Sequence, residues 1–268
     1  MTAAGVLAVV QARLGSTRLP GKALEDIAGR PMLAHVLMRA AAVPGVDRVV
    51  LATTTRSEDD ELARLARDLG IACARGSTDD VLDRFHSTLL AHPAGVVLRL
   101  TGDCPLLDPK VVQLVLDAFM RSAGTLDYVS NVDPPTYPDG LDAEVFSRPT
   151  LERAWREGVL PSDREHVTTY IRGHRDRFRV ANVVNGEDLS AYRWVVDTQA
   201  DLAFAREIYA SLDTPGPRIF GMAEVLAILR RRPELLALNA GIRRNEGLEH
   251  SRARDVVAPR RSPGGRTP

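Results

Sequence analysis

The sequence predicts an α/β protein with a mostly parallel central sheet flanked by helices, folded as a single domain. In the first half of the chain, short apolar runs alternate with helical patterns, which is the order of βαβ units with right-handed crossovers. The apolar runs show little polar alternation, which is typical of parallel strands buried on both faces. The chain of 268 residues is long enough for one large domain or two small ones, and we see no linker-like stretch that divides it.

The first half predicts four strands, at residues 6–10, 49–53, 71–74 and 96–100. Helical periodicity fills the gaps between them, at residues 31–42, 58–69 and 81–91. Ser57 and Asp60 have the spacing of a capping box at the start of the second of these helices. Asp108 and Pro109 have the pattern of an N-cap followed by proline at the first helical position, which predicts a fourth helix to about residue 122.

The second half is less regular, with loops predicted at Pro134-Pro135 and Pro138-Asp139-Gly140. It predicts helices at 151–156, 164–172 and 222–231, strands near 178–184 and 194–196, and a helix after Thr198 that Asp201 completes as a capping box. Past Gly241 the periodicity ends and Arg, Gly and Pro accumulate. We therefore expect one domain over residues 1–241 and a disordered tail over 242–268.

The composition of the chain indicates which partners, cross-links and membrane segments are not expected. The 35 basic and 35 acidic side chains give a formal net charge of zero, which argues against a nucleic-acid or membrane-surface partner. Cys73 and Cys104 have no Cys-x-x-Cys spacing, so a disulfide framework is not expected and a reducing compartment fits. The apolar run at 6–10 is too short for a signal peptide or a membrane span, so a cytoplasmic protein is expected. The sequence leaves open whether the chain forms a homodimer.

The loop at residues 11–22 follows the first strand and is rich in phosphate-binding residue types. It holds two glycines, two hydroxyl side chains, two arginines and a lysine. Glycines let the backbone approach a ligand closely, and clustered cations repel one another unless an anion lies among them. The loop is neither a Walker pattern nor Gly-x-Gly-x-x-Gly. We interpret it as a polyphosphate cradle; the alternative is a surface loop with solvated charges.

Two aspartates lie where such a sheet would bind its ligand. Ligands of open parallel sheets bind beyond the carboxyl ends of the strands, and Asp103 and Asp197 each follow a predicted strand. Mg²⁺ takes one or two protein carboxylates and completes its octahedron with phosphate oxygens and water. The pair is therefore a candidate Mg²⁺ site against a triphosphate; the alternative is that each aspartate only caps a loop.

Three segments carry a family resemblance: the loop at 11–22, Thr101-Gly102-Asp103-Cys104-Pro105, and the segment 193–198. Together they resemble the spore-coat polysaccharide cytidylyltransferase family, a branch of the acylneuraminate and 3-deoxy-manno-octulosonate cytidylyltransferases. Segments 75–84, 137–146 and 162–168 strengthen the resemblance, which covers about residues 5–212. It implies the nucleotidyltransferase fold that many sugar-nucleotide enzymes share. The sequence departs from the family at Thr169, where proline is expected, and at Val195, where threonine is common; neither position carries a charge.

The resemblance also implies roles for individual residues. Arg13 and Lys22 would bind the triphosphate, Asp103 and Asp197 would bind Mg²⁺, and these four would be the catalytic residues. The nucleotide site would comprise Gln11, Ala12, Arg13, Gly15, Ser16, Lys22, Arg75, Ser77, Thr101 and Gly102, with Arg75 and Ser77 along the base and ribose. Arg99 shares a strand face with Thr101 and either reaches the substrate or pairs with a neighbouring strand.

The acceptor site is predicted from the irregular half. The candidates are Asn131, Asp139, Asp142, Glu144, Glu165, His166 and Arg193. Asp142 and Glu144 share a strand face and suit hydroxyl-rich or amino-bearing acceptors, unless they lie on a solvated edge. His166 has a structural role as its alternative. An acidic sugar needs a cationic partner, for which Arg99 and Arg193 are candidates.

The predicted reaction is attack of an acceptor oxygen on the α-phosphorus of CTP, giving a CMP conjugate and pyrophosphate, with a small sugar-like molecule as acceptor. The main alternative is a glycosyltransferase that uses a nucleotide-sugar donor. Such enzymes usually carry Asp-x-Asp at a strand end, and Asp142-Ala143-Glu144 is the nearest approach here. A catalytically silent nucleotide-binding module is a third hypothesis, which the presence of Arg13, Lys22, Asp103 and Asp197 disfavours.

Overall fold

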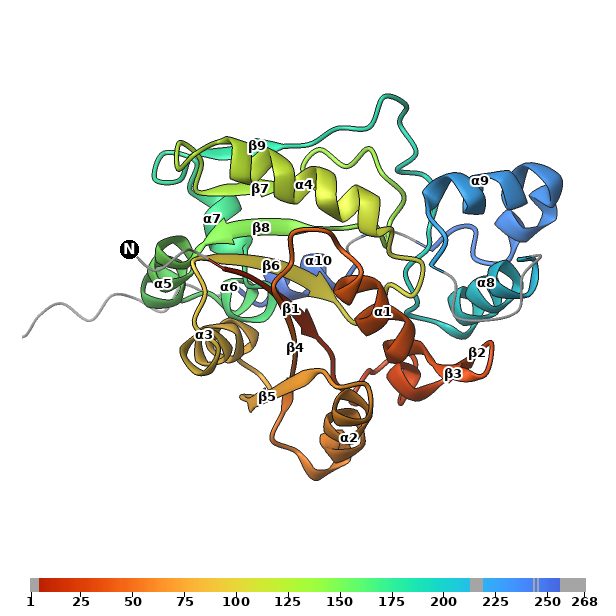
Figure 1. Ribbon diagram of the computed structural model, residues 1–268, viewed down its shortest axis with the longest axis horizontal. Helices are drawn as coiled ribbons and strands as arrows, with labels where there is room; N and C mark the ends of the chain where they lie inside the picture. The colour runs from red at the N-terminus through yellow and green to blue at the C-terminus, as the bar shows by residue number, and fades with distance from the viewer. Residues whose placement is uncertain (1–4, 213–218, 243, 245, 256–268) are drawn as a thin grey trace, which may run out of the picture.

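A computed structural model of the chain has a central sheet with the strand order β5-β4-β1-β6-β8-β7-β9 (Figure 1). The structure describes residues 5–212, 219–242, 244 and 246–255. The strands are β1 (Val6–Gln11), β4 (Arg48–Thr54), β5 (Ala72–Gly76), β6 (Val96–Thr101), β7 (Tyr128–Ser130), β8 (Glu144–Ser147) and β9 (Val180–Asn182). β8 runs antiparallel to its neighbours β6 and β7, and the other adjacent pairs are parallel. The mostly parallel sheet confirms the predicted fold class.

Helices cover both faces of the sheet. Successive side chains of β1 point to opposite faces, so the apolar residues of this strand pack against both layers of helices. Ala8 and Val10 pack with α1, α2 and α4, whereas Leu7 and Val9 pack with α3, α5 and α7. The helices are α1 (Met32–Ala41), α2 (Asp60–Asp68), α3 (Val81–Ala91), α4 (Pro109–Arg121), α5 (Arg148–Glu157), α6 (Pro161–His166), α7 (Thr169–Gly173), α8 (Gln199–Ala210), α9 (Met222–Arg231) and α10 (Glu246–Ala253). Helices α8 and α9 form a separate apolar cluster around Trp194.

Short elements complete the connections. The 3-10 turns are η1 (Lys22–Leu24), η2 (Ser57–Asp59) and η3 (Pro233–Ala237), and β2 (Asp26–Ile27) pairs with β3 (Arg30–Pro31) as a two-stranded ribbon. No helix within the described residues is long and apolar enough to cross a membrane.

Two predicted helix starts are confirmed. Asp108 caps α4 by accepting a hydrogen bond from the Lys110 backbone N–H at 2.8 Å. Thr198 and Asp201 form the expected capping box of α8, with the Asp201 N–H donating to Thr198 Oγ1 and the Thr198 N–H donating to the Asp201 carboxylate. The predicted bounds of α3 and α9 also agree with the structure.

Three local predictions are wrong. Ser57 opens the turn η2 instead of capping α2, whose N-cap makes no side-chain hydrogen bond. The helix predicted at 164–172 is divided by Val167, whose φ of 63° ends α6 before α7 begins. Residues 194–196 are not a strand of the sheet. They run beyond the strand ends, where the Val196 N–H donates to the Asp103 carbonyl at 2.8 Å.

The prediction of a disordered tail is also wrong for its described part. Residues 246–253 form α10, which packs against α6. Ser251 Oγ donates to Glu165 at 2.6 Å, and Asp255 accepts from the backbone and the hydroxyl of Ser162. These polar contacts, and not an apolar stripe, hold α10 against the domain. Hydrophobic periodicity therefore did not predict this helix. Residues 256–268 lie outside the described part of the chain.

Candidate active site

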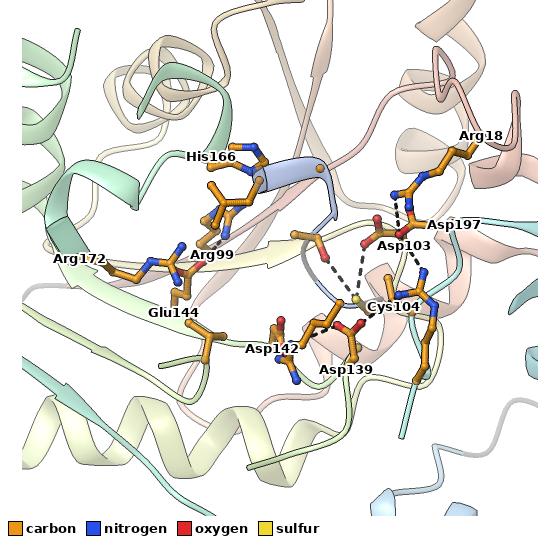
Figure 2. A pocket seen from close by; sticks show the side chains of 18 residues that line it. Arg18, Arg99, Asp103, Cys104, Asp139, Asp142, Glu144, His166, Arg172 and Asp197 are labelled. Atoms are coloured by element: carbon orange, nitrogen blue, oxygen red, sulfur yellow. Dashed lines mark hydrogen bonds and ion pairs between the residues drawn. The ribbon is translucent and has the colours of Figure 1, made fainter. Parts of the chain in front are cut away.

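Two cavities meet at the carboxyl ends of β1 and β6. The larger one, of about 590 Å³, is lined by the loop after β1, the start of α3 and one side of α10, and we call it the loop cavity. The smaller one, of about 230 Å³, is lined mainly by residues of the second half of the chain, and we call it the inner cavity (Figure 2). Both include Arg18, Thr101, Asp103, His166 and Gly247 in their lining. A ligand in one cavity can therefore contact a ligand in the other.

Lys22 joins the two predicted metal ligands at this junction. Its Nζ donates to Asp103 Oδ2 at 3.0 Å, to Asp197 Oδ1 at 2.8 Å and to the Val196 carbonyl at 2.8 Å. Burial by itself lowers the pKa of Lys22, but the two carboxylates outweigh it and the pKa is raised. Burial likewise raises the pKa of Asp103, but Lys22 and the hydrogen bonds of Thr101 and Cys104 bring it down to about 2. Lys22 and Asp103 are therefore charged at neutral pH.

Local backbone geometry brings these residues together. A Cβ on Gly102 would lie 2.7 Å from the Ala12 side chain and 2.8 Å from the Gln11 carbonyl, so only glycine lets the loop before Asp103 approach β1 so closely. Gly21 adopts a left-handed φ of 74° directly before Lys22. Asp197 lies immediately before the capped start of α8. The three charged groups thus come from three segments that the fold holds rigidly.

A hydrogen bond to Asp59 anchors the loop after β1, and the cations of this loop line the loop cavity. The backbone N–H of Leu14 donates to buried Asp59 at 2.8 Å. Arg18 crosses the junction to Asp197, 2.8 Å away (Figure 2). Arg13 donates to the Thr78 carbonyl at 3.3 Å, over the start of α3. Eight of the predicted nucleotide contacts line the loop cavity: Gln11, Ala12, Arg13, Gly15, Ser16, Lys22, Thr101 and Gly102.

Two predicted nucleotide contacts are not among the lining residues of this cavity. Arg75 donates instead to the carbonyls of Thr54 and Arg56 and to Asp60, because its edge strand places it beside the free carbonyls at the end of β4. Ser77 accepts a hydrogen bond from the Asp80 N–H at 3.1 Å in the turn that leads into α3. These contacts lie within the protein, and the contact of Arg75 and Ser77 with the base and ribose stays a prediction.

Arg84 is a cation of the loop cavity that the sequence analysis missed. It is buried, its Nη1 donates to the Ser77 carbonyl at 2.6 Å, and its Nε has no hydrogen-bond partner among the described residues. Burial and the nearby Arg13 lower its pKa to about 10. A charged residue on the otherwise apolar inner face of α3 was the available signal. An anionic ligand would relieve both the repulsion and the missing hydrogen bond.

The inner cavity balances equal numbers of acidic and basic side chains. Its described lining includes the carboxylates of Asp103, Asp139, Asp142, Glu144 and Asp197 and the guanidinium groups of Arg18, Arg99, Arg172, Arg193 and Arg244. All five of these carboxylates, and Arg193 among the arginines, were predicted acceptor or metal contacts. Arg172 and Arg244 were not singled out by the sequence analysis, and Arg99 was left open between substrate and sheet contacts.

Glu144 is deeply buried and held by three partners. It accepts hydrogen bonds from Tyr128 and Thr168, each at 2.5 Å, and pairs with Arg99. Burial raises its pKa, but Arg99 and Arg172 outweigh that effect and the pKa is lowered. Arg99 also donates to Gln11 at 3.1 Å, so it both pairs across the sheet and lines the cavity. The alternative of a solvated acidic edge is thus wrong for Glu144.

Asp139 and Asp142 form the floor of the inner cavity (Figure 2). Asp142 pairs with Arg244 at 2.6 Å, and Asp139 lies 3.1 Å from Arg193 and 3.7 Å from Arg244. Burial and the charge of Asp142 raise the pKa of Asp139 to about 7 in spite of both arginines. Burial also raises the pKa of Asp142. These two aspartates depend on their arginines to remain ionised.

Asn131 and Arg193 are two of the remaining predicted acceptor contacts. Asn131 is fully buried, donates to the Leu141 carbonyl and accepts from the Ala143 N–H, and its contact with the acceptor stays a prediction. Arg193 lines the cavity but is held by Asp139, Asp197 and Asp201.

Glu165 lines the loop cavity instead of the inner one, where it accepts from Ser251 and Arg254. His166 borders both cavities, 2.9 Å from Ser251 Oγ, and burial and Arg99 lower its pKa. His166 is the last residue of α6 and precedes Val167, the strained residue whose positive φ turns the chain toward α7.

The donor chemistry at the junction fits Mg²⁺ in one particular way. Among the described residues, no group of three or more His, Cys, Asp or Glu side chains is placed to hold a metal ion. Asp103 and Asp197 nevertheless converge on one cationic position, now held by Lys22. Two carboxylates are a usual protein contribution to Mg²⁺ when phosphate oxygens supply further ligands. The site fits Mg²⁺ bound together with a polyphosphate.

Comparison with known proteins identifies the family. A family model described as cytidylyltransferase matches residues 7–214. The spore coat polysaccharide biosynthesis protein SpsF of Bacillus subtilis is 32% identical over 236 residues, which cover 85% of this chain and 95% of that protein. A 3-deoxy-manno-octulosonate cytidylyltransferase of Anaeromyxobacter dehalogenans is 35% identical over 181 residues, 62% of this chain and 72% of that protein.

A solved structure agrees with the sequence relatives. The fold is similar to that of a cytidylyltransferase from Leptospira borgpetersenii, with a TM-score of 0.82 and 28% identity over 90% of this chain and 98% of that one. The family match spans the loop at residues 11–22, Asp103 and Asp197, the residues whose geometry defines the junction of the two cavities. This chain belongs to the cytidylyltransferase family.

Proposed function

We propose that this protein transfers CMP from CTP to a hydroxyl group of a sugar acid or a related sugar-like acceptor, with release of pyrophosphate. One observation carries the proposal: the charged cluster of Lys22, Asp103 and Asp197 lies where the loop cavity meets the inner cavity. The loop cavity, with its cations and glycines, suits the triphosphate. The inner cavity suits the acceptor. The reacting phosphorus would lie between them, beside the cluster.

In the proposed reaction, a hydroxyl oxygen of the acceptor forms a bond to the α-phosphorus. The bond from this phosphorus to the oxygen that bridges to the β-phosphate breaks, pyrophosphate leaves, and the hydroxyl proton is lost to solvent. Arg13 and Lys22 would bind the phosphates and stabilise the charge that develops on the leaving group. Asp103 and Asp197 would hold Mg²⁺, which supplies further charge neutralisation when bound. The residues of the two cavities would contribute alignment of the reacting atoms.

The glycosyltransferase hypothesis finds little support at the candidate metal motif. Asp142 and Glu144 both face the inner cavity, but each is already bound by an arginine, Arg244 and Arg99 respectively. The family assignment also favours transfer of a nucleotidyl group from the free triphosphate.

Nucleotide choice is the first test of this proposal. CTP with Mg²⁺ should raise the melting temperature more than ATP, GTP or UTP, because a ligand that binds only the native state stabilises it. At one hundred times the dissociation constant the gain is about 2.7 kcal/mol, which is about 5–10 °C for a chain of this size. Thermal denaturation with each nucleotide measures the difference. Equal shifts with all four nucleotides would contradict the cytidylyl assignment.

The division of the site into two cavities gives a second test. Asp142→Ala should raise the acceptor KM by about tenfold or more, because a charged hydrogen-bond partner of a buried contact is worth about 1.5–3 kcal/mol. CTP affinity should change little, since Asp142 is absent from the described lining of the loop cavity. Calorimetry with CTP, run beside steady-state kinetics on the same variant, separates the two effects. A collapse of CTP affinity with an unchanged acceptor KM would mean that the cavities are assigned the wrong way round.

Glu144 is a poor choice for the same test. Its replacement by alanine leaves Tyr128, Thr168 and Arg99 without a buried partner, and breaking a buried pair costs about 3–5 kcal/mol of stability. Loss of activity in that variant would report the fold as well as the site. Asp117, an exposed aspartate on α4, offers a matched Asp→Ala control outside both cavities.

A further inference from the structure

The inner cavity is completed by a segment outside the family-matched range. The match covers residues 7–214, whereas Arg244 and α10 follow it in the chain. Gly247 lines both cavities, Leu248 lines the inner one, and Arg244 reaches the floor of the inner cavity. The structure thus adds residues from beyond position 214 to a site whose other lining residues lie within the family-matched range.

This segment is fastened on both sides of Arg244. On one side, Asn239 donates to the Arg193 carbonyl and to Asp201, each at 3.0 Å, and it is buried. On the other side, Ser251 and Arg254 both donate to Glu165. Arg244 itself donates to the Tyr137 carbonyl at 3.3 Å, and its side chain is 16% exposed. Its position over the cavity floor is therefore part of the fold.

The balance of charged side chains in the inner cavity indicates the role of Arg244. Without it, the described lining would have five carboxylates facing four guanidinium groups; with it, the two are equal. Asp139 and Asp142 are the carboxylates nearest to it, and burial already opposes their ionisation. Without Arg244, the ammonium group of an amino sugar would supply the missing countercharge to these carboxylates. The same floor neutralised by an arginine accepts a carboxylate-bearing or uncharged sugar.

We propose that Arg244 is a specificity-determining residue, which cancels the charge of the Asp139–Asp142 floor and so selects acidic over amine-bearing acceptors. The inference rests on the proposed function, because it assigns the inner cavity to the acceptor. Arg244 would act through the two aspartates and take no part in the bond-making step. The choice of acceptor is thereby assigned to a residue that lies beyond the family-matched range.

The decisive experiment compares two probes, 3-deoxy-manno-octulosonate as an acid sugar and glucosamine as an amine-bearing sugar. Calorimetry would measure their binding to protein saturated with CMP. Arg244→Gln should gain affinity for glucosamine by about tenfold and lose a similar factor for the acid sugar, which corresponds to the value of one charged contact. Arg244→Lys keeps the charge and should retain the selectivity of the unmodified protein. The kinetic counterpart is a raised KM for the acid sugar with kcat nearly unchanged.

Two further variants make the test specific. In Arg244→Gln combined with Asp142→Asn, the glucosamine gain should disappear, because the acidic partner of the amine is gone. Arg232→Gln removes an arginine of the same region that pairs with Glu207 and Glu234 away from both cavities, and it should behave as the unmodified protein. The inference is overturned if Arg244→Gln gains no glucosamine affinity, or if the gain survives in the double variant. Failure of CTP to bind the unmodified protein would instead overturn the proposed function.

Discussion

Replacing Asp103 by asparagine should lower kcat by at least about 100-fold, the scale seen when one preorganised electrostatic contact to a reacting group is removed. Asp103 lies in the lining of both cavities and contacts Lys22 at 3.0 Å. Its pKa of about 2 means that the carboxylate is ionised at any pH at which the protein would be assayed. Asparagine has nearly the same shape, so the change removes the charge and leaves the packing. Pyrophosphate release at saturating CTP and Mg²⁺ measures the effect.

The controls for Asp103 separate charge from folding. Asp117→Asn makes the same chemical change on the exposed face of α4 and should keep full activity. The melting temperature of Asp103→Asn should stay close to that of the unmodified protein, because Lys22 retains Asp197 and the Val196 carbonyl as partners. The Mg²⁺ concentration for half-maximal activity should rise in Asp103→Asn. Near-normal turnover in this variant would show that the reacting phosphorus does not lie at the junction.

The position of Asp103 beside the loop at residues 11–22 could be predicted from sequence alone. Asp103 follows β6, which pairs parallel to β1, so the carboxyl ends of the two strands bring Asp103 close to this loop. Asp197 reached the same place for a different reason. The segment before it is not a strand, but the Val196 N–H binds the Asp103 carbonyl and holds the two aspartates side by side. The prediction of position was right although the predicted element was wrong.

The two missed arginines differ in the signal that their sequence offers. Arg244 pairs with Asp142, which lies 102 residues away, and such a pair leaves no periodic signal. Arg84 bonds the nearby Ser77 carbonyl, and its charge among the buried residues of α3 was the available signal. Arg75 shows the converse, because its motif predicts a nucleotide contact whereas its hydrogen bonds in the structure go to the Thr54 and Arg56 carbonyls and to Asp60. Hydrophobic pattern predicts which faces are buried, whereas the destination of a long charged side chain depends on which carboxylates and carbonyls remain unpaired nearby.

Lys22 is distinctive because the chain contains only two lysines among its 35 basic residues. Arginine is used at the other cationic positions around the site, yet the junction between Asp103 and Asp197 has a lysine. A compact ammonium can donate to three acceptors from one point, whereas a planar guanidinium needs acceptors arranged along its edge. The three acceptors of Lys22 lie within 3.0 Å of a single nitrogen. The geometry therefore requires lysine at this position.

Lys22→Ala should reduce both CTP affinity and kcat, the former by about tenfold and the latter by at least about 100-fold, because the ammonium would contact the transferring phosphates as well as the two aspartates. Lys22→Arg should restore little of either, since the guanidinium does not fit the three-acceptor geometry. Lys110→Ala, at the other lysine of the chain, changes an exposed side chain on α4 and should have no effect. Calorimetry with CTP and pyrophosphate release at low CTP measure the two quantities separately.

A rival account makes Lys22 only a substitute for the metal, placed between the aspartates until Mg²⁺ arrives. On that account, removing the ammonium would free Asp103 and Asp197, so Lys22→Ala would bind Mg²⁺ more tightly and keep its rate once the metal saturates. If Lys22 instead binds phosphate, the rate stays low at every Mg²⁺ concentration, because no other group supplies its charge to the leaving pyrophosphate. A Mg²⁺ titration of Lys22→Ala at saturating CTP therefore decides between the two. Full recovery at high Mg²⁺ would remove Lys22 from the phosphate-binding residues and leave it as a structural partner of the aspartates.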